Sequence, residues 1–131
     1  MKRRVIAVSS ARRVELVDIT ADAEAAVSGT DEGILHLFSP HTTAALLINE
    51  HEDGLISDLE EYLANLAPPS RAYRHDRIDS NATAHMVAAV TGSSLSVPVE
   101  GGRLALGTWQ RIFLVELDGP RSRRLVATLI P

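Results

Sequence analysis

The chain has 131 residues, a length that fits one domain able to bury a core without disulfides or structural metals. Hydrophobic residues make up 45% and charged residues 23%, and the net charge of −4 argues against a general nucleic-acid binder. There are no cysteines, which excludes disulfides, thiolate nucleophiles and cysteine-based zinc sites, so any metal site must use histidine and carboxylate ligands.

No apolar run reaches the roughly 20 residues needed to cross a bilayer. The N-terminus also lacks the apolar stretch of a signal peptide. We therefore expect a soluble cytoplasmic protein that binds neither membranes nor nucleic acid.

The first part of the chain predicts strands with one short helix between them. Alternating or continuous apolar residues indicate strands over 5–8, 14–19, 34–38 and 43–48. Thr20 is expected to cap a short helix over 21–27. The run over 43–48 is apolar almost throughout, which is typical of a strand that is covered on both faces.

Helices are predicted in the middle of the chain. Leucines recur with helical spacing from Leu55 to Leu66, which predicts a helix over roughly 52–66. Residues 70–81 form a polar connection that is long for so small a domain, and ordered long loops are often functional. A residue within 79–81 can cap a further helix that carries His85.

The last part of the chain returns to strands. They are predicted over 94–99, over 104–117 with an interruption at 107–110, and over 125–130, with turns between them. Strands first, helices next and a strand meander at the end predict an α+β fold. We expect one compact domain over 1–131, with a mostly antiparallel, sandwich-like sheet and about three helices.

Three histidines stand in settings that suit metal ligands. His41 follows a strand end, His75 lies in the polar connection, and His85 is one turn into a helix. Each has polar neighbours of the kind that orient a metal ligand. None of them shares the close spacing of a helical histidine pair, and a lone histidine is more often a hydrogen-bonded surface residue. Spacing alone therefore supports a metal site only weakly.

Other polar residues are candidates for substrate chemistry. Glu50 ends an apolar strand and could take a proton or orient a ligand. Gln110 adjoins Trp109, the only tryptophan, which is either part of a site or a packed aromatic at a β-bulge. Arg121 in a turn can bind phosphate with its guanidinium fork, or it is an ordinary surface arginine.

These segments together resemble the YjbQ family, also called UPF0047, whose members are labelled secondary thiamine-phosphate synthases. The resemblance spans nearly the whole chain and rests on these blocks in this order: Ser39-Pro40-His41-Thr42-Thr43-Ala44, Ile48-Asn49-Glu50, His75, Asn81-Ala82-Thr83-Ala84-His85, Gly92-Ser93-Ser94 with Pro98, Gly107-Thr108-Trp109-Gln110 and Asp118-Gly119-Pro120-Arg121.

The resemblance implies a homotrimer with a divalent metal held by His41, His75 and His85. A three-histidine site suits zinc better than magnesium, so zinc is the expected metal. The implied reaction joins a pyrimidine carrying pyrophosphate to a thiazole phosphate and releases pyrophosphate, whose charge the metal and arginines such as Arg121 or Arg74 would neutralise.

On this basis we expect His41 and Glu50 to be catalytic. The expected substrate-binding residues are Thr43, Asn81, Gln110 and Arg121. Two alternatives stay open: a metal-assisted hydrolase of a phosphorylated small molecule, and a non-catalytic trimer that binds a small molecule or anion.

Overall fold

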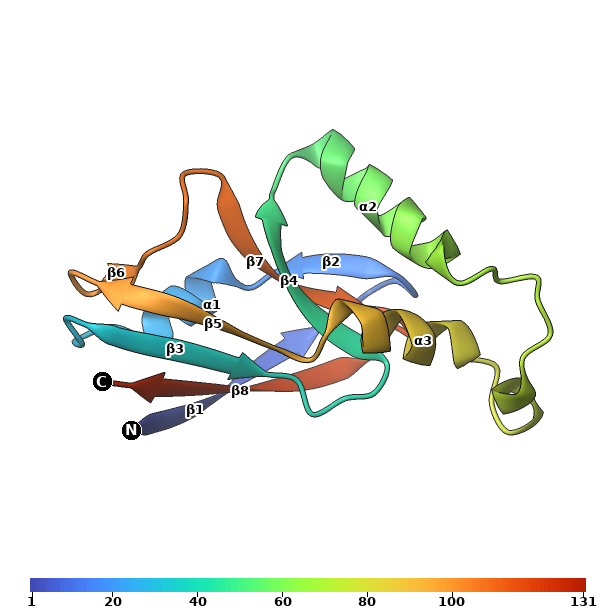
Figure 1. The fold of residues 1–131 in the computed structure, drawn as a ribbon, viewed down its shortest axis with the longest axis horizontal. Helices are drawn as coiled ribbons and strands as arrows, with labels where there is room; N and C mark the ends of the chain where they lie inside the picture. The colour runs from blue at the N-terminus through green and yellow to red at the C-terminus, as the bar shows by residue number, and fades with distance from the viewer.

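The structure is a computed structural model that describes residues 1–131, with eight strands, three α-helices and one 3-10 helix (Figure 1). The elements in chain order are β1 Lys2–Ser9, β2 Glu15–Asp18, α1 Thr20–Ala26, β3 Gly33–Phe38, β4 Ala44–Glu50, α2 Asp53–Leu66, η1 Arg74–Arg77, α3 Ala82–Thr91, β5 Ser94–Glu100, β6 Arg103–Leu104, β7 Gln110–Glu116 and β8 Ser122–Ile130. None of the helices combines the length and apolarity required to cross a membrane.

The strands form two sheets in which every pairing is antiparallel. The larger sheet has the order β1-β8-β3-β5-β6 and the smaller has the order β2-β7-β4. Lys2 on β1 lies opposite Leu129 on β8, so the two ends of the chain run side by side (Figure 1). This arrangement confirms the predicted α+β fold with antiparallel sheets and three helices.

The smaller sheet lies in the middle of the molecule and is buried on both faces. One face packs against the larger sheet and α1, through residues such as Leu46 and Ile112. The other face packs against α2 and α3, through residues such as Ala45, Phe113 and Leu63. This double burial explains why β4 and β7 are apolar at successive positions instead of alternating.

Helix α2 follows its predicted boundaries closely. Glu52 precedes it, and the Glu52 carboxylate accepts hydrogen bonds from the amides of Gly54 and Leu55. Because the first amides of a helix lack intrahelical partners, this side chain fixes where α2 begins.

The prediction that Thr20 caps α1 is wrong. Thr20 is already helical, and its hydroxyl accepts a hydrogen bond from the Ile112 amide at 2.9 Å. The amide of Thr20 donates to the Asp18 carboxylate at 2.9 Å instead. The hydroxyl therefore ties α1 to β7, a partner 92 positions away that local sequence does not reveal.

Candidate functional site

Strand β4 divides the predicted site residues into two groups. His41 and Thr43 precede this seven-residue strand, whereas Glu50 ends it opposite Gln110 on β7. Seven residues of extended strand span roughly 20 Å. We call the first group the histidine end, made of His41, Thr43, His75, Asn81, His85 and Arg121, and the second the glutamate end, made of Glu50, Trp109 and Gln110.

Two of the predicted metal ligands lie in contact. The rings of His75 on η1 and His85 on α3 pack edge to face with 4.7 Å between their centroids. Both line a cavity of about 530 Å³, which we call the arginine cavity because Arg71 and Arg74 line it too. The guanidinium of Arg71 also lies over the Tyr73 ring, 5.6 Å from its centroid.

The third histidine occupies a neighbouring cavity. His41 lines a cavity of about 410 Å³ together with Thr42, Ser93 and His85, so His85 borders both cavities. His41 Nε2 lies 3.0 Å from the amide nitrogen of Arg124 and 3.1 Å from its carbonyl oxygen. Burial lowers the pKa of His41, and the nearby charge of Arg123 also lowers it. The neutral, ligand-competent form of this imidazole is therefore favoured.

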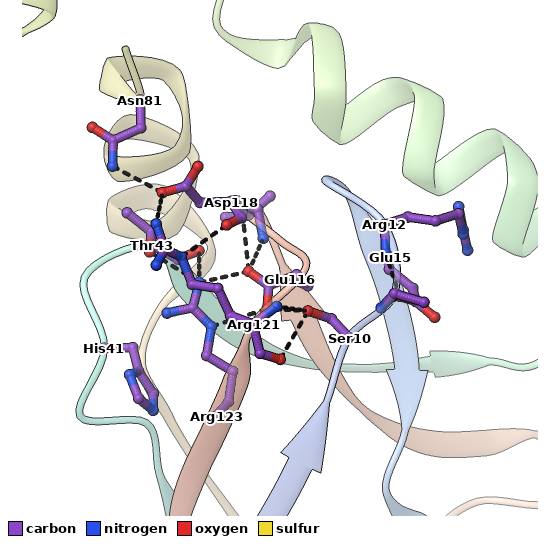
Figure 2. A network of polar contacts seen from close by, with 12 residues as sticks. Ser10, Arg12, Glu15, His41, Thr43, Asn81, Glu116, Asp118, Arg121 and Arg123 are labelled. Atoms are coloured by element: carbon purple, nitrogen blue, oxygen red, sulfur yellow. Dashed lines mark hydrogen bonds and ion pairs between the residues drawn. The ribbon is translucent and has the colours of Figure 1, made fainter. Parts of the chain in front are cut away.

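A chain of hydrogen bonds connects His75 to Arg121. His75 Nε2 lies 3.0 Å from Asn81 Oδ1, and Asn81 Nδ2 donates to Asp118 Oδ2 at 2.9 Å. Arg121 donates to the same Asp118 oxygen at 3.0 Å (Figure 2). Burial alone would raise the pKa of Asp118, but the hydrogen bonds from Asn81 and Arg121 outweigh burial and lower it. Asn81 and Arg121, predicted to bind substrate, thus make their polar contacts within the chain.

Thr43 also has an internal partner. Its hydroxyl and its carbonyl oxygen both accept from Arg123 Nη2, at 3.0 and 3.2 Å. Arg123 forms an ion pair with Glu116, and both side chains are buried (Figure 2). Burial would raise the pKa of Glu116, but hydrogen bonds from Arg123 and Ser10 lower it overall. This ion pair fixes the residues that lead from His41 into β4.

The glutamate end presents an exposed aromatic. Trp109 is 71% exposed, so it is not the packed aromatic that was one reading of the sequence. Gln110 Oε1 accepts from the Gly107 amide at 2.8 Å and closes the turn that carries Trp109. Glu50 pairs with Gln110 across the ladder between β4 and β7. These residues form a polar and aromatic edge that is open to a ligand or to another chain.

A second polar cluster lies beside Glu50 and was not expected from the sequence. Asp18 Oδ2 lies 2.8 Å from both His51 Nδ1 and Arg111 Nε. Burial opposes ionisation of Asp18, but hydrogen bonds from Arg111, His51 and Thr20 hold its pKa well below the usual range. These residues come from distant parts of the chain, so no local motif signals their contact.

The histidines of one chain fit a divalent metal only in part. His75 and His85 supply two imidazoles in contact, and imidazole nitrogen is a suitable zinc ligand. Nowhere in the chain do three or more histidine, cysteine, aspartate or glutamate side chains gather closely enough to hold an ion. A catalytic zinc site uses three protein ligands, so if zinc bound to His75 and His85, one more ligand would have to come from a movement of His41 or from another chain.

Several residues around the histidine end were not selected from the sequence. Arg71, Tyr73 and Met86 line the arginine cavity, and Asp118 and Glu116 anchor the surrounding hydrogen bonds. The only available signal was position: Arg71 and Tyr73 fall in the polar connection, and Asp118 begins the turn that holds Arg121.

Comparison with known proteins places the chain in a family. The family model described as UPF0047 protein YjbQ-like matches residues 4–131. A UPF0047 protein of Archaeoglobus fulgidus is 50% identical over 92% of this chain and 95% of its own, and UPF0047 protein YugU of Bacillus subtilis is 35% identical over 92% of each chain.

Solved structures agree with this assignment. A YbjQ-like protein of unknown function from Sulfolobus solfataricus superposes with a TM-score of 0.95 at 45% identity, covering 98% of this chain and 96% of that one. A hypothetical protein from Aeropyrum pernix gives a TM-score of 0.95 at 40% identity, covering 99% and 98%. The fold, the order of the motifs and these similarities together show that the chain belongs to the YjbQ-like UPF0047 family.

Proposed function

We propose that the protein is a metal-dependent transferase of the thiamine-phosphate synthase type, which joins a pyrimidine pyrophosphate to a thiazole phosphate and releases pyrophosphate. The observation that carries this proposal is the composition of the arginine cavity. Two guanidinium groups and two imidazoles line it, and none of its eight lining residues is acidic. Such a cavity favours a ligand that carries several negative charges.

The arginines of this cavity are available for an anion. None of the ion pairs of the chain involves Arg71 or Arg74. A guanidinium without a carboxylate partner can donate two parallel hydrogen bonds to a phosphate. We therefore assign Arg71 and Arg74 to the phosphate groups of the substrates, and the apolar side chain of Met86 to the heterocycle.

The histidine pair supports the proposed metal. His75 and His85 would hold the ion, with His41 as the third ligand. We propose zinc, because zinc binds well to imidazole nitrogen. A bound divalent ion would supply positive charge to neutralise the departing pyrophosphate.

A homotrimer would complete this site. Glu50 and Gln110 are predicted site residues, yet β4 holds them roughly 20 Å from His41 within one chain. A cyclic trimer places different parts of the same surface against each other, so the glutamate end of one subunit can meet the histidine end of the next. In that assembly Glu50 would take or orient a proton at the neighbouring arginine cavity.

A non-catalytic anion-binding trimer is the second candidate. The observation that favours it is the absence of three grouped metal ligands within the chain, because an arginine-lined cavity can bind an anion without a metal. In this case phosphate groups would bind to Arg71 and Arg74 and no product would form.

Metal content and product formation test the two candidates. Protein purified without a histidine tag is expected to carry about one zinc ion per chain. Incubation with the pyrimidine pyrophosphate and the thiazole phosphate is expected to yield thiamine phosphate and pyrophosphate, measured by chromatography. No metal and no product, with pyrophosphate binding retained, would instead establish the binding protein.

The residue assignment is tested with matched histidine variants. H85A is expected to lose metal and activity, whereas H36A is expected to keep both, because His36 lies on β3 and lines neither cavity. Full activity in H85A would overturn the assignment of the histidine end.

A further inference from the structure

In the series of hydrogen bonds that links His75 to Arg121, the chemistry of each group determines whether it donates or accepts. Four side chains are involved in series: His75, Asn81, Asp118 and Arg121. Asn81 is 7% exposed, so water reaches this amide poorly. Its two polar atoms each have one protein partner at 3.0 Å or less. A buried amide with both ends engaged cannot rotate without losing hydrogen bonds.

Asp118 determines which way the Asn81 amide faces. A carboxylate can only accept hydrogen bonds, and Arg121 can only donate them. Arg121 donates to the Asp118 carboxylate at 3.0 Å and to the Asp118 carbonyl oxygen at 2.9 Å, which holds that carboxylate in place. The group of Asn81 that faces Asp118 must therefore be its NH₂ group, and its oxygen must face His75.

The orientation of Asn81 then determines the proton position on His75. An amide oxygen only accepts, so the His75 nitrogen 3.0 Å away must carry a hydrogen. We propose that Asp118 acts through Asn81 as a positioning residue that holds neutral His75 with its proton on Nε2, leaving Nδ1 as the nitrogen with a free lone pair.

This assignment extends the proposed function. If His75 binds a metal or accepts a proton, it does so through Nδ1. Asn81 orients the ring without placing a negative charge beside it, unlike the carboxylate that often contacts a metal-binding histidine. Asn81 and Asp118 thus affect chemistry in the arginine cavity through His75, although neither is needed as a direct substrate contact.

Nitrogen-15 NMR of histidine-labelled, metal-free protein without substrate tests the inference. The spectrum is recorded with a neutral ring, so that it reports which of the two ring nitrogens carries the proton. His75 is expected to show a protonated Nε2 whose hydrogen exchanges slowly with water, because it is hydrogen-bonded to a buried amide. His75 signals are identified by their loss in H75Q.

The Asp118→Ala variant removes the acceptor that orients Asn81. The amide can then rotate, and the ratio of the Nε2–H form to the Nδ1–H form is expected to fall about fivefold to tenfold, the effect of losing one hydrogen bond. The slowly exchanging signal is expected to disappear as well. The control is D79A, because Asp79 is a carboxylate near Asn81 in the chain whose hydrogen bond goes only to the neighbouring Ser80 amide.

Two results would overturn the inference: a native His75 protonated on Nδ1, or an unchanged proton position and exchange rate in D118A. The native spectrum decides the first point even if D118A does not fold. Since metal and substrate are absent from the experiment, its outcome does not depend on whether the protein is a synthase. Failure of the synthase assay would leave the proton position of His75 intact as a finding.

Discussion

The guanidinium of Arg123 and the carboxylate of Glu116 form an ion pair that is closed off from solvent, with side chains 5% and 0% exposed. The pair satisfies many backbone groups around it: Glu116 accepts from the amides of Leu117 and Asp118, and Arg123 donates to the Thr43 carbonyl. It therefore joins β7, β8 and the start of β4 at the place where the histidine end is built.

Removing the positive partner of this pair is expected to destabilise the fold strongly. R123M leaves the Glu116 carboxylate buried without a counter-charge and should lower the free energy of unfolding by about 3–5 kcal/mol. Urea denaturation measures the loss. R124M is the matched control, because Arg124 is exposed on the same strand, and its effect should stay within about 0.5 kcal/mol. Equal effects in the two variants would show that the buried pair has no special role.

The same carboxylate predicts a loss of stability in acid. The folded pKa of Glu116 lies below its ordinary value of 4.5, so the folded state binds its proton less readily than the unfolded state does. Its contribution to stability is complete above pH 4.5 and is lost as the pH falls through the lower folded pKa.

The acid effect is measured as the free energy of unfolding from neutral to acid pH. E116Q should be less stable at neutral pH and should lose less stability on acidification than the native protein. E32Q, which changes an exposed carboxylate, should follow the native curve. Parallel curves for E116Q and the native protein would contradict the prediction.

Anion binding in the arginine cavity is expected to depend on Arg74. Loss of charge-assisted hydrogen bonds in R74A should weaken pyrophosphate binding by about 10-fold or more. Isothermal titration calorimetry with inorganic pyrophosphate and metal-free protein measures this change. R77A is the control, because Arg77 belongs to η1 but does not line the cavity. A larger loss in R77A than in R74A would place the anion elsewhere.

Subunit sharing of the site predicts complementation between inactive variants. H85A disables the histidine end and E50Q disables the glutamate end. In a mixed cyclic trimer an intact histidine end can meet an intact glutamate end from the neighbouring subunit. Random assembly from equal amounts would make about a quarter of the sites intact.

Activity of the co-refolded mixture, relative to the native protein refolded in the same way, measures this sharing. The control is a mixture of H85A with H75A, which damages the same end in every subunit and should stay inactive. Recovery in the control, or none in the H85A and E50Q mixture, would contradict a site shared between subunits.

The local elements were largely determined by the sequence. The leucine spacing from Leu55 to Leu66 predicted α2, and the structure places it at Asp53–Leu66. The glycine pair Gly101-Gly102 adopts positive φ angles of 58° and 77° and makes the predicted turn before β6. These features depend on neighbours in the chain, since helix periodicity and turn conformation are set within a few residues.

The composition of the site was decided by the tertiary structure. His75 and His85 were both selected from the sequence, but only the packing of η1 against α3 brings their rings together. Glu50 was grouped with His41 by motif, whereas an extended β4 holds the two apart. Asn81 was one of three candidate caps for α3, yet its side chain joins His75 to Asp118, 37 positions along the chain.

The physical reason is that polar side chains take partners wherever the fold leaves a donor or acceptor unpaired. An apolar residue needs only to lie on the buried face of its helix or strand, and the periodicity of apolar residues along the sequence indicates that face. Hydrogen-bond partners are chosen among groups brought close by packing, so the contacts of Thr20, Asn81 and Arg123 required the assembled sheets.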